Sequence, residues 1–157
     1  MTKESAKKRL RRAVDAILDC IEHGQWEWVS DNYHLIHRYA KALQKSKAER
    51  EIAAAEGEVS AYLAETGWKP TEESLCAHFG EYCRFAPMEY AVLRAVPLCL
   101  AFCAILRIGD ICRGEKSAAL LPDAIGVLRC LSEIRTSRLL EESWQGEPVL
   151  LAGEKDY

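Results

Sequence analysis

Histidine and cysteine side chains are the residues of this chain that could bind a metal ion or attack a substrate. They form three groups, which are His34 with His37, Cys99 with Cys103, and His78 with Cys76 and Cys83. A spacing of three or four residues places two ligands on one face of a helix, where they could share an ion. No group has the two closely spaced ligand pairs of a zinc site. Cysteines that fill the core, with histidines beside an aromatic stripe, are the preferred interpretation.

Nucleophilic catalysis would need a cysteine or serine beside a base and a third group that orients the base. His78 lies near Cys76 and Cys83 in the sequence, but no pattern brings these side chains together. Solvated helix surface explains the paired carboxylates at 72–73 and 141–142 better than acid–base catalysis does. The sequence also has no glycine-rich phosphate loop. We therefore expect no catalytic residue, no cofactor and no metal ion in this chain.

An aromatic stripe is the most distinctive local pattern. It consists of Trp26, Val29, Tyr33, Ile36 and Ala40. Their spacing of three or four residues predicts one helix face that packs into the core. Asp31 and Asn32 would be costly to bury without hydrogen-bond partners. Aromatic rings can also stack on sugars, but the helical spacing favours packing over a carbohydrate platform.

Composition and charge indicate one globular domain over residues 1–157, with an irregular tail from about residue 144. Hydrophobic residues make up 49% of the 157 residues, which is typical of folded domains. The net charge of −3 argues against nucleic acid as a partner. Basic residues cluster at positions 7–12 and could touch an anionic membrane or RNA, although a solvated helix face is the preferred interpretation.

Cysteine usage and hydropathy indicate a cytoplasmic chain. The seven cysteines are odd in number and lie mostly in apolar helical stretches, and we expect no leader peptide, so they indicate free thiols in a reducing compartment. The apolar run from Ala95 to Leu106 is much shorter than the roughly 20 residues of a membrane-spanning helix. We expect it to form a buried core helix.

Periodicity and breaker residues predict an all-α fold, an irregular bundle of about six helices. The predicted segments are 4–22, about 25–62 with a break near Gly57, 71–85, 87–111 and 117–140. Thr71 is a predicted N-cap, and Gly24 and Gly67 are predicted stops. Pro87 suits a first helical position, whereas Pro97 should kink or divide the helix that contains it.

Two segments resemble bacterial cyclic β-1,2-glucan synthases. The stretch 28–36 (WVSDNYHLI) resembles the Trp-Leu-Leu-Asp-Asn-Tyr/Phe-x-x-Ile/Val segment near the N-terminus of that family. The stretch 87–98 (PMEYAVLRAVPL) is similar to its Pro-Leu-x-x-x-Glu-Leu-Trp-Ala-Ile-Pro-x-x-Leu helix, and 125–143 is a weaker third match. Ser30 and Arg94 depart from the pattern, where the family has an apolar residue and a tryptophan.

The resemblance implies a role without catalysis. Such synthases are large inner-membrane enzymes that polymerise glucose from UDP-glucose, and their catalytic parts lie outside the region that this chain resembles. The chain would be a cytoplasmic helical scaffold or regulatory segment at the inner face of the bacterial inner membrane. Its partner would be the remainder of the synthase or another subunit, and it would meet the membrane only indirectly. The end at Tyr157, where the next family motif would begin, suggests a shortened chain.

The resemblance also implies structural roles for the matched residues. These are Trp28, Asp31, Asn32, Tyr33, Pro87, Glu89 and Pro97. The two aromatic residues would lie in the core, and the polar pair would fix a junction between helices. Two alternatives stay open: a free-standing helical module that binds a protein or a ligand, and a small metal- or thiol-dependent enzyme.

Overall fold

The computed structural model describes residues 4–24 and 27–146, and these residues form helices and no strands. The all-α prediction is confirmed. The predicted number of about six helices is wrong, because the described residues contain nine α-helices. They are α1 (Ala6–Glu22), α2 (Glu27–Asp31), α3 (Tyr33–Lys45), α4 (Glu49–Glu65), α5 (Glu72–Phe85), α6 (Tyr90–Arg94), α7 (Val96–Cys112), α8 (Leu121–Cys130) and α9 (Thr136–Ser143).

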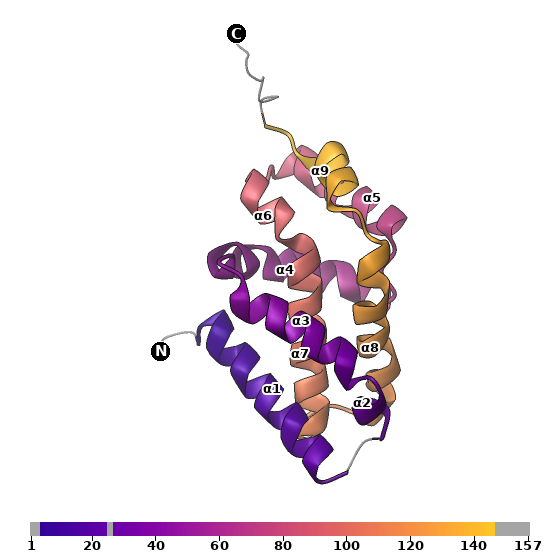
Figure 1. Ribbon diagram of the computed structural model, residues 1–157. Coiled ribbons are helices and arrows are strands. Elements are labelled where there is room, and N and C mark those ends of the chain that lie inside the picture. Colours follow the sequence, from indigo (N-terminus) through magenta and orange to yellow (C-terminus); the bar gives the residue numbers. More distant parts are fainter. Residues whose placement is uncertain (1–3, 25–26, 147–157) are drawn as a thin grey trace.

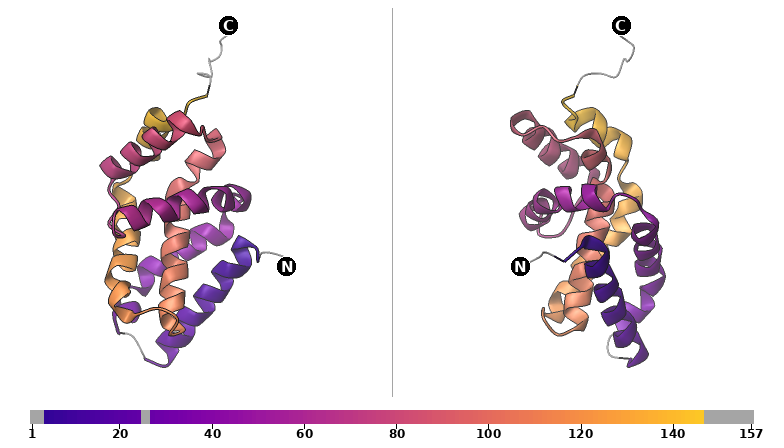
Figure 2. Two further views of the ribbon diagram at one scale, coloured as in Figure 1. Left: turned by 180° about the vertical axis from the view of Figure 1, so that it is seen from behind. Right: turned by 90° about the vertical axis from the view of Figure 1, so that its left-hand side faces the viewer.

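Helix α7 forms the centre of the bundle. Its apolar sequence is buried on nearly all sides, as the run from Ala95 to Leu106 predicts. Helices α1, α3, α4 and α8 all pack against it. Helix α3 crosses on one side of α7 and α4 crosses on the other (Figures 1 and 2). No helix in the described part of the chain is long and apolar enough to cross a membrane.

The contact between α1 and α7 depends on a glycine. A Cβ atom added to Gly109 would lie 2.8 Å from both the Cα and the Cβ of Ala13. Both residues are buried, so the backbones of the two helices approach directly at this point. Any larger residue at either position would push α1 away from the centre.

The predicted helix over 25–62 is divided twice. Asn32 separates α2 from α3, and the segment from Ser46 to Ala48 separates α3 from α4. Ser46 has extended backbone angles, and its hydroxyl accepts a hydrogen bond from the Ala48 N–H at 3.0 Å. This local hydrogen bond replaces the helical one. The predicted break at Gly57 is wrong, because α4 continues through it; the stop at Gly67, where φ is +63°, is confirmed.

The two prolines of the predicted helix over 87–111 have different outcomes. Pro87 does not begin a helix, because α6 begins at Tyr90 with Glu89 at its N-cap. Pro97 divides the segment as predicted, since α6 ends at Arg94 and α7 begins just before the proline. In the first turn of α7 the missing N–H of proline has no helical partner to lose.

Helices α5, α6 and α9 form one end of the molecule (Figure 1). Thr71 caps α5, because its hydroxyl accepts from the Ser74 N–H at 3.0 Å and the Thr71 N–H donates to the Ser74 hydroxyl at 3.2 Å. The predicted N-cap is therefore confirmed. The predicted helix over 117–140 is wrong, because it forms two short helices, α8 and α9, with a turn between them. Of the predicted tail only 144–146 is described, and it is not helical; Trp26 also lies outside the described residues.

Candidate functional site

The candidate metal-ligand groups of the sequence do not come together in the structure. His34 and His37 are both exposed on α3, whereas Cys99 and Cys103 are buried within α7. The Cys99 thiol donates a hydrogen bond to the carbonyl oxygen of Ile52 at 3.6 Å. Among the described residues, no group of three or more His, Cys, Asp or Glu side chains could hold a metal ion.

The thiols also lack the environment of a nucleophile. All seven cysteines are free, and burial raises the pKa of Cys76 and of Cys83 above the ordinary value. Burial likewise raises the pKa of Cys130 to about 11 and, together with the neighbouring Cys20, that of Cys112 to about 12. Because the thiolate is the reactive form, these thiols are poor nucleophiles near neutral pH.

A polar junction joins Asn32 to α8. The Asn32 side chain is 5% exposed, and its amide nitrogen donates to the carbonyl oxygen of Trp28 at 2.8 Å. Its amide oxygen accepts a hydrogen bond from the guanidinium of Arg129 on α8. Asn32 thus contacts residues of α2 and α8, and its role in fixing the junction stays a prediction. Asp31 is exposed and takes no part in this junction.

The two aromatic residues beside this junction differ from expectation. Trp28 is 43% exposed, so the expectation that it lies in the core is wrong. The start of α2 turns its ring outward, and the guanidinium of Arg129 lies 5.7 Å from the ring centroid. Tyr33 is half-buried, with its ring 5.7 Å from that of His37. Among the described members of the stripe, Val29, Ile36 and Ala40 are buried.

A histidine between two carboxylates is the most concentrated polar cluster. His78 on α5 places Nε2 2.6 Å from Glu58 and Nδ1 2.8 Å from Glu65, both on α4. The ring can donate to both carboxylates only when both nitrogens carry protons. The imidazole thus cross-links α5 to two carboxylates of α4.

Tyr62 on α4 also belongs to this cluster. Its ring meets that of His78 edge-on at 5.3 Å, and its hydroxyl lies 2.6 Å from the Ser74 hydroxyl. The same hydroxyl donates to the carbonyl oxygen of Thr71 at 3.3 Å. Burial is the main cause that raises the pKa of Tyr62. The phenol therefore stays protonated and ties the start of α5 to α4.

An open cleft of about 580 Å³ lies over this cluster. Its walls carry the carboxylates Glu58, Glu65 and Glu81, with Tyr82 beside them. A surface with several carboxylates accepts hydrogen bonds from hydroxyl or ammonium groups. The sequence pattern points to His78 but not to its partners Glu58 and Glu65. The spacing of seven residues between Glu58 and Glu65 places both on one helix face, but it does not show which helix packs there.

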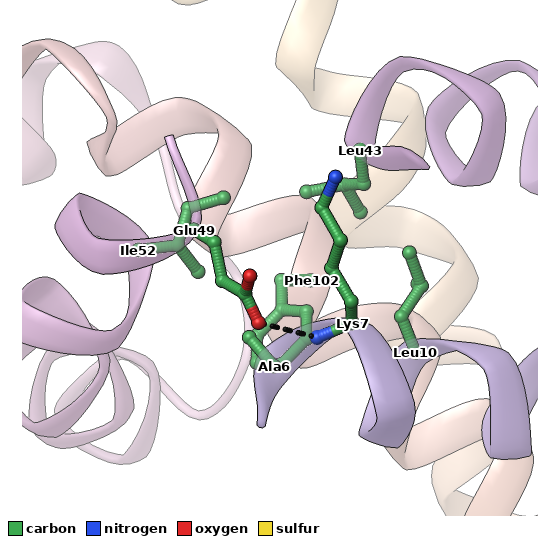
Figure 3. A pocket seen from close by; sticks show the side chains of 7 residues that line it. All are labelled: Ala6, Lys7, Leu10, Leu43, Glu49, Ile52 and Phe102. Carbon is green, nitrogen blue, oxygen red and sulfur yellow. Dashed lines mark hydrogen bonds between the residues drawn. The ribbon is translucent and has the colours of Figure 1, made fainter. Parts of the chain in front are cut away.

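A second cavity is too small for a ligand. It measures about 10 Å³ and lies where α1, α3 and α4 meet above Phe102 (Figure 3). The Lys7 N–H donates to the Glu49 carboxylate across its rim at 3.1 Å. This volume holds no more than about one water molecule.

Of the carboxylates at 72–73, Glu73 is exposed as expected, whereas Glu72 is mostly buried in contacts with α9. Its side chain is 15% exposed and accepts from the guanidinium groups of Arg135 at 3.0 Å and Arg138 at 2.9 Å. These hydrogen bonds lower the pKa of Glu72 to about 2. The carboxylate thus fastens α9 to the first turn of α5.

Comparison of this chain with protein-family models, with curated proteins and with solved structures finds no match.

Proposed function

We propose that this chain is a non-catalytic helical scaffold or regulatory segment of a cyclic β-1,2-glucan synthase-like glycosyltransferase. It would act in the cytoplasm, at the inner face of the membrane that holds the enzyme. The observation that carries the proposal is the position of the residues matched to that family. Asn32 joins α3 to α8, Glu89 is the N-cap of α6 and Pro97 lies in the first turn of α7, so each lies at a junction between helices.

An exposed apolar surface supports a scaffold that contacts another part of an enzyme. Phe85 is 81% exposed, Tyr90 is 43% exposed, and Pro87 between them is also exposed. The Tyr90 ring packs edge-on against Trp144 at 5.2 Å. We call Phe85, Pro87 and Tyr90 the apolar end. Exposed aromatic residues that cluster in this way are typical of protein contact surfaces.

Association with a transferase tests this role. The partner is the polypeptide that bears the transferase and carries the family's Met-Asp-x-x-Thr-Arg element, produced together with this chain. We expect the two to co-purify, and the double substitution Phe85→Ser/Tyr90→Ser to weaken their association at least tenfold, as loss of two central aromatic contacts does. Leu18→Ser is the matched control, because Leu18 is 43% exposed on α1, away from the apolar end.

The outcome of that experiment decides whether the chain is a scaffold that binds the transferase. Loss of association in the double variant, with Leu18→Ser unchanged, supports the proposal. Failure of the unaltered chain to associate with the transferase part would refute it. Phe85, Tyr90 and Leu18 are exposed, so replacing them with serine should leave the midpoint of unfolding nearly unchanged.

A ligand-binding module is the second candidate, and the cleft over His78 favours it. Calorimetric titration with UDP-glucose and with β-1,2-linked glucan oligosaccharides tests this function. Heat from either ligand that disappears in Glu58→Gln would assign the cleft a part in substrate handling, since Glu58 lines it. A folded sample that gives no heat would leave the scaffold role.

A further inference from the structure

The solvent face of α3 is uniformly basic. His34, Arg38, Lys41 and Lys45 follow one another at intervals of three or four residues, and all four are exposed. This spacing aligns them along one side of the helix. Helix α3 contains no acidic residue that would interrupt the row.

The charges of this row are not neutralised by the protein. Within residues 4–24 and 27–146, none of the four takes part in a salt bridge, whereas Arg9 is paired with Glu56 at 2.7 Å. The unpaired row therefore presents its positive charge to whatever approaches the helix from outside.

Helix α1 widens this surface at the end of α3. The Lys7 ammonium donates to the carbonyl oxygen of Gln44 at 3.3 Å. Lys7 and Arg11 line a groove of about 210 Å³ together with Gln44. We call the row on α3, with Lys7 and Arg11, the basic face. Its other end is limited by Glu27 and Asp31, which are exposed on α2.

The opposite side of the bundle carries the opposite charge. Helix α4 crosses α7 on the side away from α3 (Figures 1 and 2). It bears five glutamates, Glu49, Glu51, Glu56, Glu58 and Glu65, against one arginine, Arg50. Although the whole chain has a net charge of −3, the charged residues of α3 are basic and most of those of α4 are acidic.

We propose that the basic face docks on the surface of an anionic phospholipid bilayer. A flat polyanionic surface can meet the row on α3, which lies on the side of α7 away from α4; Glu49 of α4 borders the basic face at Lys7, whose N–H donates to it. The row on α3 has no apolar side chain, and the imidazole of His34 is its single ring. Contact is therefore electrostatic and reversible, without insertion of a helix into the lipid, and it provides no stacking platform for the bases of RNA. This interaction is independent of the enzyme to which the chain belongs.

Vesicle sedimentation with the full chain tests the docking. We expect binding to vesicles of equimolar phosphatidylglycerol and phosphatidylcholine, none to pure phosphatidylcholine, and release as salt is added. Each removed charge near the surface should weaken binding about fivefold, so Arg38→Gln/Lys41→Gln/Lys45→Gln should bind about a hundredfold more weakly.

A control variant separates the basic face from net charge. Arg84→Gln/Arg94→Gln/Lys116→Gln removes the same number of positive charges from exposed positions outside the basic face. Unchanged vesicle binding in this variant supports the assignment. An equal loss in both variants, equal binding to neutral vesicles, or binding to RNA with no binding to anionic vesicles would overturn it. Circular dichroism and the unfolding midpoint confirm that both variants are folded.

Discussion

At the scale of single residues, Asn32 is the side chain that does most to join separate parts of the chain. Its amide is buried and satisfied on both sides, by the Trp28 carbonyl and by the Arg129 guanidinium. Replacement of the amide by an apolar group removes both of these hydrogen bonds.

Asn32→Leu should therefore destabilise the fold by about 1–3 kcal/mol, although leucine is similar in size. The free energy of unfolding in urea measures this. Asp31→Ala is the neighbouring control, because Asp31 is exposed, and it should change stability by no more than about 0.5 kcal/mol. Equal effects of the two substitutions would contradict the role of Asn32 in the junction.

Trp28 is expected to contribute much less than a core aromatic residue. Its ring is 43% exposed and contacts Arg129, an interaction of about 0.5–1 kcal/mol at an exposed site. Trp28→Ala should cost no more than about 1.5 kcal/mol in urea unfolding, against about 3–5 kcal/mol for the fully buried Phe79→Ala. A loss for Trp28→Ala as large as that for Phe79→Ala would show that the ring is buried in solution.

Sequence patterns find the residues at this scale but not their partners. The stripe and the cost of burying a polar group single out Asn32, yet Arg129 lies 97 positions away and no local pattern connects them. Trp28 fails for a different reason. Its expected place in the core comes from the family resemblance and not from the stripe, and its helix ends after one turn at Asp31.

At the scale of helices, close approach and charge decide which elements meet. Gly109 lets α1 lie directly on α7, and Glu72 fastens α9 to α5. Sequence patterns predict α1, α5 and the core helix α7 well, because their caps and apolar residues are local. The predicted long helices over 25–62 and 117–140 are wrong, because a local turn at Ser46 ends α3 and a turn separates α8 from α9.

Gly109→Ala should weaken the contact between α1 and α7. The added methyl group would meet the Ala13 backbone, and overpacking of this kind costs about 1–3 kcal/mol. Gly126→Ala on α8 is the control. A Cβ there meets nothing within 4 Å, so the same substitution should raise stability by up to about 1 kcal/mol. Thermal unfolding compares the two; a stabilised Gly109→Ala protein would contradict the helix contact.

Acid should loosen the contact between α5 and α9. The pKa of Glu72 is about 2 in the folded protein, below its ordinary value of 4.5, so its carboxylate stabilises the fold above pH 4.5. This stabilisation is lost as the pH falls from 4.5 towards 2. The melting temperature of the unaltered protein should therefore drop more steeply over that range than that of Glu72→Gln. Parallel curves would contradict the role assigned to Glu72.

At the scale of the whole molecule, three surfaces have distinct characters. The α3 row of the basic face lies across α7 from the acidic helix α4, and the apolar end lies at the far end of the bundle on α5 and α6 (Figure 1). A segment that holds a transferase at a membrane would need one surface for each contact. We propose the apolar end and the basic face as these two surfaces.

The measurement that tests the central claim most directly is β-1,2-glucan synthesis from UDP-glucose by the transferase part, with and without this chain. We predict that the chain alone releases no UDP, and that its addition raises the rate or the stability of the transferase, but not when Phe85 and Tyr90 are replaced by serine. Release of UDP by the chain alone, or a transferase that responds equally to both forms, would contradict a scaffold that acts through the apolar end.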